Sequence, residues 1–278
     1  MLEPRAGTFY SVDTLNPDVV RWRGRYLLFF SGNQVATDAG MWATGVAVAD
    51  RPQGPYRILR QVGDFYNGGT ARWKGQLWHG ASDRNGDPVL LRSRDGVRWS
   101  AVGPVPQDAA WRAITSDLYL RPSTDKLRIY FAGRPGAAGA DIGTAVYAEG
   151  RWQDFDMALE RTDGWDRLDL GEPAVFTLGG RDLMLYAGLG EDGDARHIGL
   201  AYRNGGAWRR CAGPLISAGG ELYRQNAIDP EPLVVGSRLY LFFGGGDRPS
   251  LGGNMGGRIL VRVYDLSARS AAEPRGGN

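Results

Sequence analysis

The sequence is poor in cysteine and in long apolar segments. Cys211 is the only cysteine among the 278 residues, which excludes a scaffold held together by internal disulfide bonds. No apolar run approaches the roughly 20 residues that a membrane-spanning helix needs. Residues 1–5 also lack the basic and apolar segments of a signal peptide. We therefore expect a cytoplasmic protein with no membrane partner.

Lysine is scarce as well, and the charge of the chain is nearly balanced. Lys74 and Lys126 are the only lysines among 33 basic residues, which stand against 31 acidic residues and leave a formal net charge of +2. The excess of arginine fits a codon bias as well as a need for bidentate hydrogen bonds. A nucleic-acid-binding protein is usually more basic than this. We expect no nucleic-acid partner.

The sequence is rich in glycine and in short apolar runs. Glycine accounts for 42 residues, without a three-residue period, and 42% of the residues are apolar, enough to form a full core. The glycines separate short runs of aromatic and β-branched residues, a composition typical of strands joined by tight turns. Helical periodicity is weak, and residues 152–161 are the one candidate for a helical turn.

One motif, an apolar strand that ends in small residues, recurs along the chain at a spacing of roughly 50 to 57 residues. Each copy is preceded by a second strand and a short turn, and it is followed by a third strand and another turn. Two strands joined in this way form a hairpin. The five copies of the motif are Tyr26–Gly32, Leu77–Gly80, Leu127–Gly133, Leu183–Gly188 and Leu239–Gly245.

These units predict an all-β fold, a five-bladed β-propeller with antiparallel blades of three to four strands. Each unit is too small to bury both of its faces alone, so the units would pack face to face around an axis. A two-sheet sandwich is the alternative, but it does not require a period near 50 residues. We expect residues 1–267 to form a single domain and the tail, residues 268–278, to be mobile.

Acidic residues precede or begin the first strand of four units. These strands would line the central channel, so their side chains would meet although they are far apart in sequence. Carboxylates gathered at one mouth repel one another and acquire different pKa values, as an acid/base pair requires. An acid beside proline can equally cap a strand, and this structural interpretation stays open. The candidate catalytic residues are Asp18, Asp117, Glu172 and Glu231.

The same motifs resemble the five-bladed furanosidases and xylosidases, above all family 43 of the glycoside hydrolases and the related families 32, 62 and 68. The resemblance covers roughly residues 8–266. It implies that Glu172, before Pro173, is the general acid and that Asp117 tunes this acid.

The first unit departs from the pattern of that family, because Asn16 stands where the resemblance places the general base. Asp18, two positions further along, would return to the same face of the strand, displaced by roughly 6 to 7 Å. The segment Asp229-Pro230-Glu231 in the fifth unit matches the base motif better than the first unit does. The base is therefore expected from Asp18 or from Glu231.

Other polar residues near the starts of the inner strands are candidates for substrate binding, although they suit ordinary solvated loops as well. His79 and His197 are too far apart in the repeat for a metal pair, and His79 is interpreted as a buried structural imidazole. We expect no metal site and no cofactor, while the resemblance leaves room for a calcium ion in the channel. The candidate substrate-binding residues are Asn16, Arg72, Arg224, Asn226 and Asp229.

The resulting expectation is a glycoside hydrolase-like enzyme that acts on a small pentose or furanose glycoside, with a carboxylate pair and inverting chemistry. The alternative is a propeller of the same descent that does not hydrolyse sugars, either a sugar or metabolite-binding protein or a tailoring enzyme that uses the acid-lined channel. The substrate would be a small molecule or an oligosaccharide. The sequence leaves the oligomeric state open.

Overall fold

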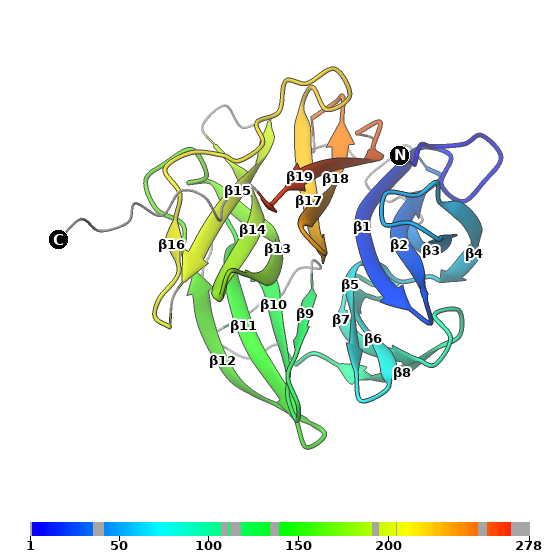
Figure 1. The fold of residues 1–278 in the computed structure, drawn as a ribbon, viewed down its shortest axis with the longest axis horizontal. Coiled ribbons are helices and arrows are strands. Elements are labelled where there is room, and N and C mark those ends of the chain that lie inside the picture. Colours follow the sequence, from blue (N-terminus) through cyan, green and yellow to red (C-terminus); the bar gives the residue numbers. More distant parts are fainter. Residues whose placement is uncertain are drawn as a thin grey trace.

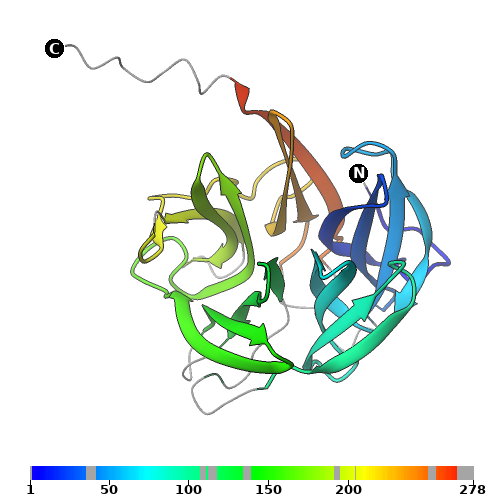
Figure 2. The same ribbon diagram turned by 60° about the horizontal axis from the view of Figure 1, so that its bottom comes forward.

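The computed structural model describes residues 2–35, 42–106, 111, 118–133, 139–190, 195–203, 205–249 and 255–267. Within these ranges the elements are 19 β-strands, arranged as small sheets around one centre (Figure 1 and Figure 2). The described part of the chain holds no helix of the length and apolarity that crossing a membrane demands. The tail, residues 268–278, lies outside the described residues.

The first two sheets are antiparallel, and each has four strands in sequence order. The first consists of β1 (Asp13–Trp22), β2 (Arg25–Asn33), β3 (Trp42–Ala49) and β4 (Arg57–Gly63). The second consists of β5 (Tyr66–Trp73), β6 (Gln76–Ser82), β7 (Pro88–Ser93) and β8 (Trp99–Pro104).

The third sheet is antiparallel too, and the last has seven strands. The third consists of β9 (Tyr119–Pro122), β10 (Leu127–Gly133), β11 (Asp141–Ala148) and β12 (Arg151–Leu159). The last contains β13 (Asp169–Leu178), β14 (Arg181–Leu189), β15 (Arg196–Arg203), β16 (Arg209–Arg210), β17 (Asn226–Val235), β18 (Arg238–Gly246) and β19 (Arg258–Asp265).

The seven-stranded sheet combines two of the repeats seen in the sequence. Strands β13 to β16 form one antiparallel unit and β17 to β19 form another, and the two are joined through a parallel pairing of Arg196 with Asn226. The prediction of an all-β chain with antiparallel sheets is confirmed. The expected separation into five sheets is not, because this pairing links the last two units by hydrogen bonding.

The hairpin turns explain why the strands pair as the repeat predicts. Arg23 and Gly24 connect β1 to β2, and Lys74 and Gly75 connect β5 to β6. All four have φ between 47° and 82°. Positive φ at both central residues defines a type I′ turn, whose twist matches that of the strands it joins. Glycine adopts this conformation without steric cost, which is why it occupies the second position.

The inner strands form a closed ring, in which β1 contacts β5, β5 contacts β9, β9 contacts β13, β13 contacts β17, and β17 contacts β1. The cores lie between neighbouring units. Val19 and Phe30 of the first sheet, for example, are buried in one cluster with Phe242 of β18. Leu2 exchanges two backbone hydrogen bonds with Ile259 of β19, at N···O distances of 3.0 and 2.8 Å. These hydrogen bonds connect the N-terminal segment of the chain to its last strand, β19.

One element was predicted wrongly. Residues 152–161 do not form a helical turn, because Arg151–Leu159 is the outer strand β12. Register shifts occur twice where β12 pairs with β11, and Asp154 has a φ of 55°. Such bulges interrupt the alternation of inward and outward side chains. The two-residue period that marks a strand is therefore hidden in this stretch of sequence.

Candidate functional site

A bulge is repeated near the start of four inner strands. The pairing of β1, β5, β13 and β17 with the next strand shifts in register after residues 15, 66, 171 and 228. The residue that follows each shift has φ between 48° and 53°, a left-handed conformation that non-glycine residues rarely adopt. Such strain is typical of functional sites. The four residues are Asn16, Asn67, Glu172 and Asp229.

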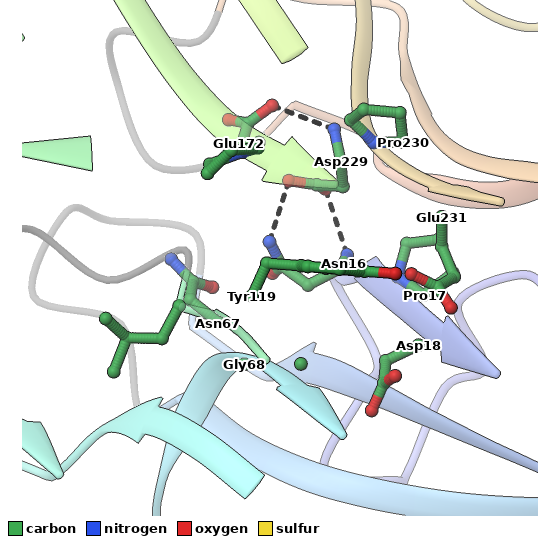
Figure 3. A pocket seen from close by; sticks show the side chains of 13 residues that line it. Asn16, Pro17, Asp18, Asn67, Gly68, Tyr119, Glu172, Asp229, Pro230 and Glu231 are labelled. Carbon is green, nitrogen blue, oxygen red and sulfur yellow. Dashed lines mark hydrogen bonds between the residues drawn. The ribbon is translucent and has the colours of Figure 1, made fainter. Parts of the chain in front are cut away.

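These four residues meet at the centre of the ring, where they line one cavity. Its volume is about 40 Å³, room for one or two water molecules. Figure 3 shows Glu172 and Asp229 on one side of Asn16 and Asp18 on the other. The complete lining is Asn16, Pro17, Asp18, Asn67, Gly68, Gly69, Leu118, Tyr119, Glu172, Pro173, Asp229, Pro230 and Glu231.

Asp229 organises the part of the cavity that is uppermost in Figure 3. Its carboxylate accepts hydrogen bonds from the backbone N–H of Asn16 at 2.9 Å and from the Asn16 side-chain amide, with 2.7 Å between Nδ2 and Oδ1. The backbone N–H of Asp229 in turn donates to Glu172 Oε2 at 2.8 Å. Asp229 therefore makes hydrogen bonds both with Asn16, which stands in the expected base position, and with Glu172, the expected acid.

Glu172 is a half-buried residue that lines the cavity. Desolvation raises its pKa above the ordinary value. The nearby Arg196 guanidinium and the hydrogen bond from Asp229 oppose this effect, while the negative charge of Asp169 adds to it. A carboxyl that lines a cavity and keeps its proton to a higher pH than usual is suited to general acid catalysis.

The lower part of the cavity holds two buried carboxyls, Asp18 and Glu231, which are 2% and 7% exposed. Burial raises the pKa of Asp18 to about 7, although hydrogen bonds from Thr70 lower it. Burial and, secondarily, the negative charge of Asp18 raise the pKa of Glu231 well above its usual value. Two such neighbours resist ionising together, so the pair tends to hold one proton between them.

Tyr119 completes this lower part of the cavity. Burial and then the negative charges of Glu231 and Asp18 raise the pKa of Tyr119. Its phenol therefore remains protonated at neutral pH. Glu231 Oε1 also accepts a hydrogen bond from the backbone N–H of Val19, with 3.5 Å between N and Oε1. This contact connects the fifth unit to the first.

Five of the residues singled out in the sequence meet at this cavity: Asn16, Asp18, Glu172, Asp229 and Glu231. Asp117 lies outside the described residues. The sequence analysis missed Asn67 and Tyr119. Asn67 could have been found because it occupies the same place in the repeat as Asn16, and Tyr119 because it lies two positions after the candidate Asp117.

Three residues predicted to bind substrate do not line the cavity. Arg72 is exposed near the far end of β5, with its guanidinium carbon 5.5 Å from the centre of the Trp22 ring. Arg224 is exposed. Asn226 is buried, and its side-chain amide donates to the backbone oxygen of Arg248 at 2.5 Å. Nearness to a strand start was an insufficient criterion, because side chains alternate between faces along a strand.

Within the described ranges, histidine, cysteine, aspartate and glutamate form no group of three or more that could hold a metal ion.

The Asn16–Asp229 contact makes a direct prediction about stability. Asn16→Asp replaces the donor amide by a carboxylate that faces Asp229, so we expect a loss of about 1–3 kcal/mol in the free energy of unfolding at pH 7. The double variant Asn16→Asp with Asp229→Asn restores a hydrogen bond of reversed polarity and should regain most of this loss. Urea unfolding of the three proteins measures both values. Equal stability of the single variant and the wild type would contradict the contact.

Comparison with known proteins identifies the fold. No protein-family model and no curated protein sequence matches the chain. Among solved structures, a thermostable family-43 glycoside hydrolase superposes with a TM-score of 0.71 at 15% identity, over 95% of this chain and 92% of the other. The chain thus has the propeller fold of these glycoside hydrolases.

Two further structures show how widely this fold is used. The α-L-arabinofuranosidase of Podospora anserina, in complex with cellotriose, gives a TM-score of 0.73 at 12% identity, over 95% of this chain and 94% of that one. The β-1,2-mannobiose phosphorylase of Listeria innocua, in complex with mannobiose, gives 0.70 at 12% identity, over 92% and 90%. At such identities the similarity shows the fold, and the chemistry has to be argued from the site.

Proposed function

We propose that this protein is a glycoside hydrolase-like enzyme whose acid/base groups lie at the centre of a five-bladed propeller. The observation that carries the proposal is the meeting of Asp18, Glu172 and Glu231 in one cavity, with the pKa of each raised above its ordinary value. The two halves of the seven-stranded sheet count as separate blades in this proposal. The closed ring of five inner strands supports that count.

The proposed reaction assigns one proton transfer to each side of the sugar. Glu172, protonated at the mouth, donates its proton to the leaving oxygen as the glycosidic C–O bond breaks. The pair of Asp18 and Glu231 takes a proton from water, whose oxygen forms the new bond to the anomeric carbon. Net inversion follows if water attacks from the face opposite the leaving group. Such a mechanism calls for about 6.5 to 9.5 Å between the two carboxyl groups.

The proposed substrate is a small pentose or furanose glycoside. The cavity of about 40 Å³ accommodates water but not a sugar ring, so the sugar would lie over its mouth with the scissile bond beside Glu172. The arabinofuranosidase among the structural neighbours supports a furanoside. The mannobiose phosphorylase adds a mannoside as a second sugar to be assayed.

The proposal is tested with the purified protein on 4-nitrophenyl glycosides of arabinofuranose, xylose and mannose between pH 5 and 8. We expect nitrophenol release from at least one of these substrates, with an inverted anomer as the first product by NMR. Absence of turnover on all three, in a protein that is folded by circular dichroism, would reject hydrolysis of these glycosides.

A second candidate function follows from Asn16, whose amide cannot act as a general base. A propeller without hydrolytic activity would bind a sugar or small metabolite at the same mouth, or transfer the sugar to a nucleophile that is already an anion. Inorganic phosphate is such a nucleophile, and the Arg196 guanidinium acts on Glu172 from nearby. Repeating the assay with phosphate, together with thermal shifts by unhydrolysed sugars and small acids, separates transfer from binding.

A further inference from the structure

His79 lies directly behind the wall of the cavity. It belongs to β6 and is 1% exposed, in contact with the rings of Phe29, Phe65 and Trp99 at centroid distances of 5.9, 5.3 and 5.3 Å. Gly68 separates it from the cavity, and a Cβ at Gly68 would come within 2.5 Å of His79 Nε2. The imidazole thus occupies the space that a side chain at position 68 would need.

His79 is connected to Asp18 through Thr70. The Nδ1 atom of His79 is 2.8 Å from Thr70 Oγ1 and 3.8 Å from Asp18 Oδ2. Thr70 acts on Asp18 through its side chain and its backbone N–H, both of which lower the pKa of the carboxyl, whereas Asp18 Oδ2 has no hydrogen-bond partner among the described residues. Three side chains from three strands, β6, β5 and β1, therefore lie together in one buried polar group, of which Asp18 lines the cavity.

The hydrogen atoms of this group can be assigned by counting donors. A threonine hydroxyl has one proton, and an ionised Asp18 can only accept, so the hydroxyl donates to Asp18. Thr70 Oγ1 then accepts a hydrogen bond from Nδ1–H of His79, which requires the tautomer with a bare Nε2. The Nε2 atom has no hydrogen-bond partner among the described residues in either tautomer. The imidazole is neutral, since burial lowers the pKa of His79 to about 3.

We propose that His79 and Thr70 are positioning residues, which aim the Asp18 carboxyl into the cavity and keep it ready to accept a proton through the chain His79 Nδ1–Thr70 Oγ1–Asp18. This rests on the proposed function, in which Asp18 belongs to the pair that deprotonates water. The burial of His79 agrees with the sequence-based interpretation of a buried imidazole, and the proposal adds a role for it, because Nδ1 makes its hydrogen bond toward the site.

Three titratable groups face Asp18, each from a different strand: Glu231 from β17, Tyr119 from β9 and His79 from β6. The negative charge of Asp18 disfavours ionisation of Glu231, and Tyr119 remains neutral. Thr70 is therefore the neighbour that stabilises the ionised carboxylate, and His79 orients the Thr70 hydroxyl for that role. Removing the hydroxyl should make Asp18 harder to ionise.

The test follows the Asp18 carboxyl itself and does not depend on turnover. Protein labelled with ¹³C at aspartate carboxyls is titrated by NMR, and the Asp18 signal is assigned with Asp18→Asn. We expect Thr70→Val, which keeps the volume of the side chain, to raise the pKa of Asp18 by about one pH unit, whereas Thr70→Ser leaves it unchanged. An unchanged Asp18 titration in Thr70→Val would overturn the proposal.

Variants of His79 provide the second part of the test. Asparagine presents an amide near the position of Nδ1, so His79→Asn should preserve the Asp18 titration, while His79→Leu should shift it in the same direction as Thr70→Val. In an active enzyme, the acid limb of the kcat/KM profile should move by the same amount. A shifted carboxyl in a protein without glycosidase activity would refute the proposed function alone. An active enzyme whose Asp18 titration and acid limb are indifferent to Thr70→Val would refute the positioning role alone.

Discussion

Glu172→Gln is expected to lower kcat on 4-nitrophenyl glycosides by a factor of about 10² to 10⁴, the usual contribution of a general acid. Glutamine has nearly the size of glutamate, and its carbonyl oxygen can still accept the N–H of Asp229, so the fold should be retained. What the variant loses is the proton that Glu172 delivers to the leaving oxygen. Initial rates at pH 6 measure the effect.

The leaving group distinguishes this role from a general disturbance of the site. The dinitrophenolate of a dinitrophenyl glycoside leaves as a stable anion and needs little protonation. Glu172→Gln should therefore slow the hydrolysis of this glycoside less than tenfold. Equal losses with both leaving groups would contradict the assignment of Glu172 as the acid. Glu160→Gln, which neutralises an exposed carboxyl after β12, is the matched control and should leave both rates unchanged.

The second large effect concerns Asp18 and the dependence of stability on pH. The pKa of Asp18 is about 7 in the folded protein and 3.8 for the ordinary group. A raised folded-state pKa means that its stabilising contribution is full below pH 4 and is lost as the pH rises through about 7. The difference corresponds to roughly 4 kcal/mol disfavouring the ionised form at pH 8.

Asp18→Asn removes this charge while it keeps the shape of the side chain. We therefore expect the variant to be more stable than the wild type at pH 8, by up to about 4 kcal/mol, and to show a flatter profile of unfolding free energy between pH 5 and 8. Its glycosidase activity should fall at the same time. Urea unfolding at several pH values provides the profile.

Two comparisons sharpen this result. Glu231→Gln should shift the profile in the same direction, and the two substitutions together should gain less than the sum of their separate effects, because the negative charge of Asp18 contributes to the raised pKa of Glu231. Asp50→Asn changes a carboxyl whose side chain is 79% exposed and should leave the profile as it is in the wild type. A profile of Asp18→Asn parallel to that of the wild type would show that another group causes the dependence.

Much of the fold could be predicted because the repeat is local. The strand and turn at Val19–Gly24 has its counterpart at Ala71–Gly75, and both form hairpins as expected. The outer strand β12 was missed because its bulges conceal the alternation of side chains. The sequence signals therefore suffice where a strand is regular and fail where its register shifts.

The membership of the site could be predicted only in part. Asp18, Glu172 and Glu231 were found because inner strands of a propeller begin at its centre. Arg72 was placed there wrongly, since it lies nearer the far end of its strand, against Trp22. Tyr119 was missed because the candidates were chosen among acidic and polar side chains, so that Asp117 was selected from this segment and the aromatic residue was not.

By itself, the sequence determined the repeat, the strands with their turns, and the presence of acids where inner strands begin, because these features depend on residues a few positions apart. Only the tertiary structure decided that Asp229 binds Asn16, 213 positions earlier, that the charge of Asp18 opposes the ionisation of Glu231, and that His79 packs behind Gly68, which lines the cavity. Such contacts arise when separate units pack around a common centre, and the distances and burial that shift a pKa exist only once that packing has formed.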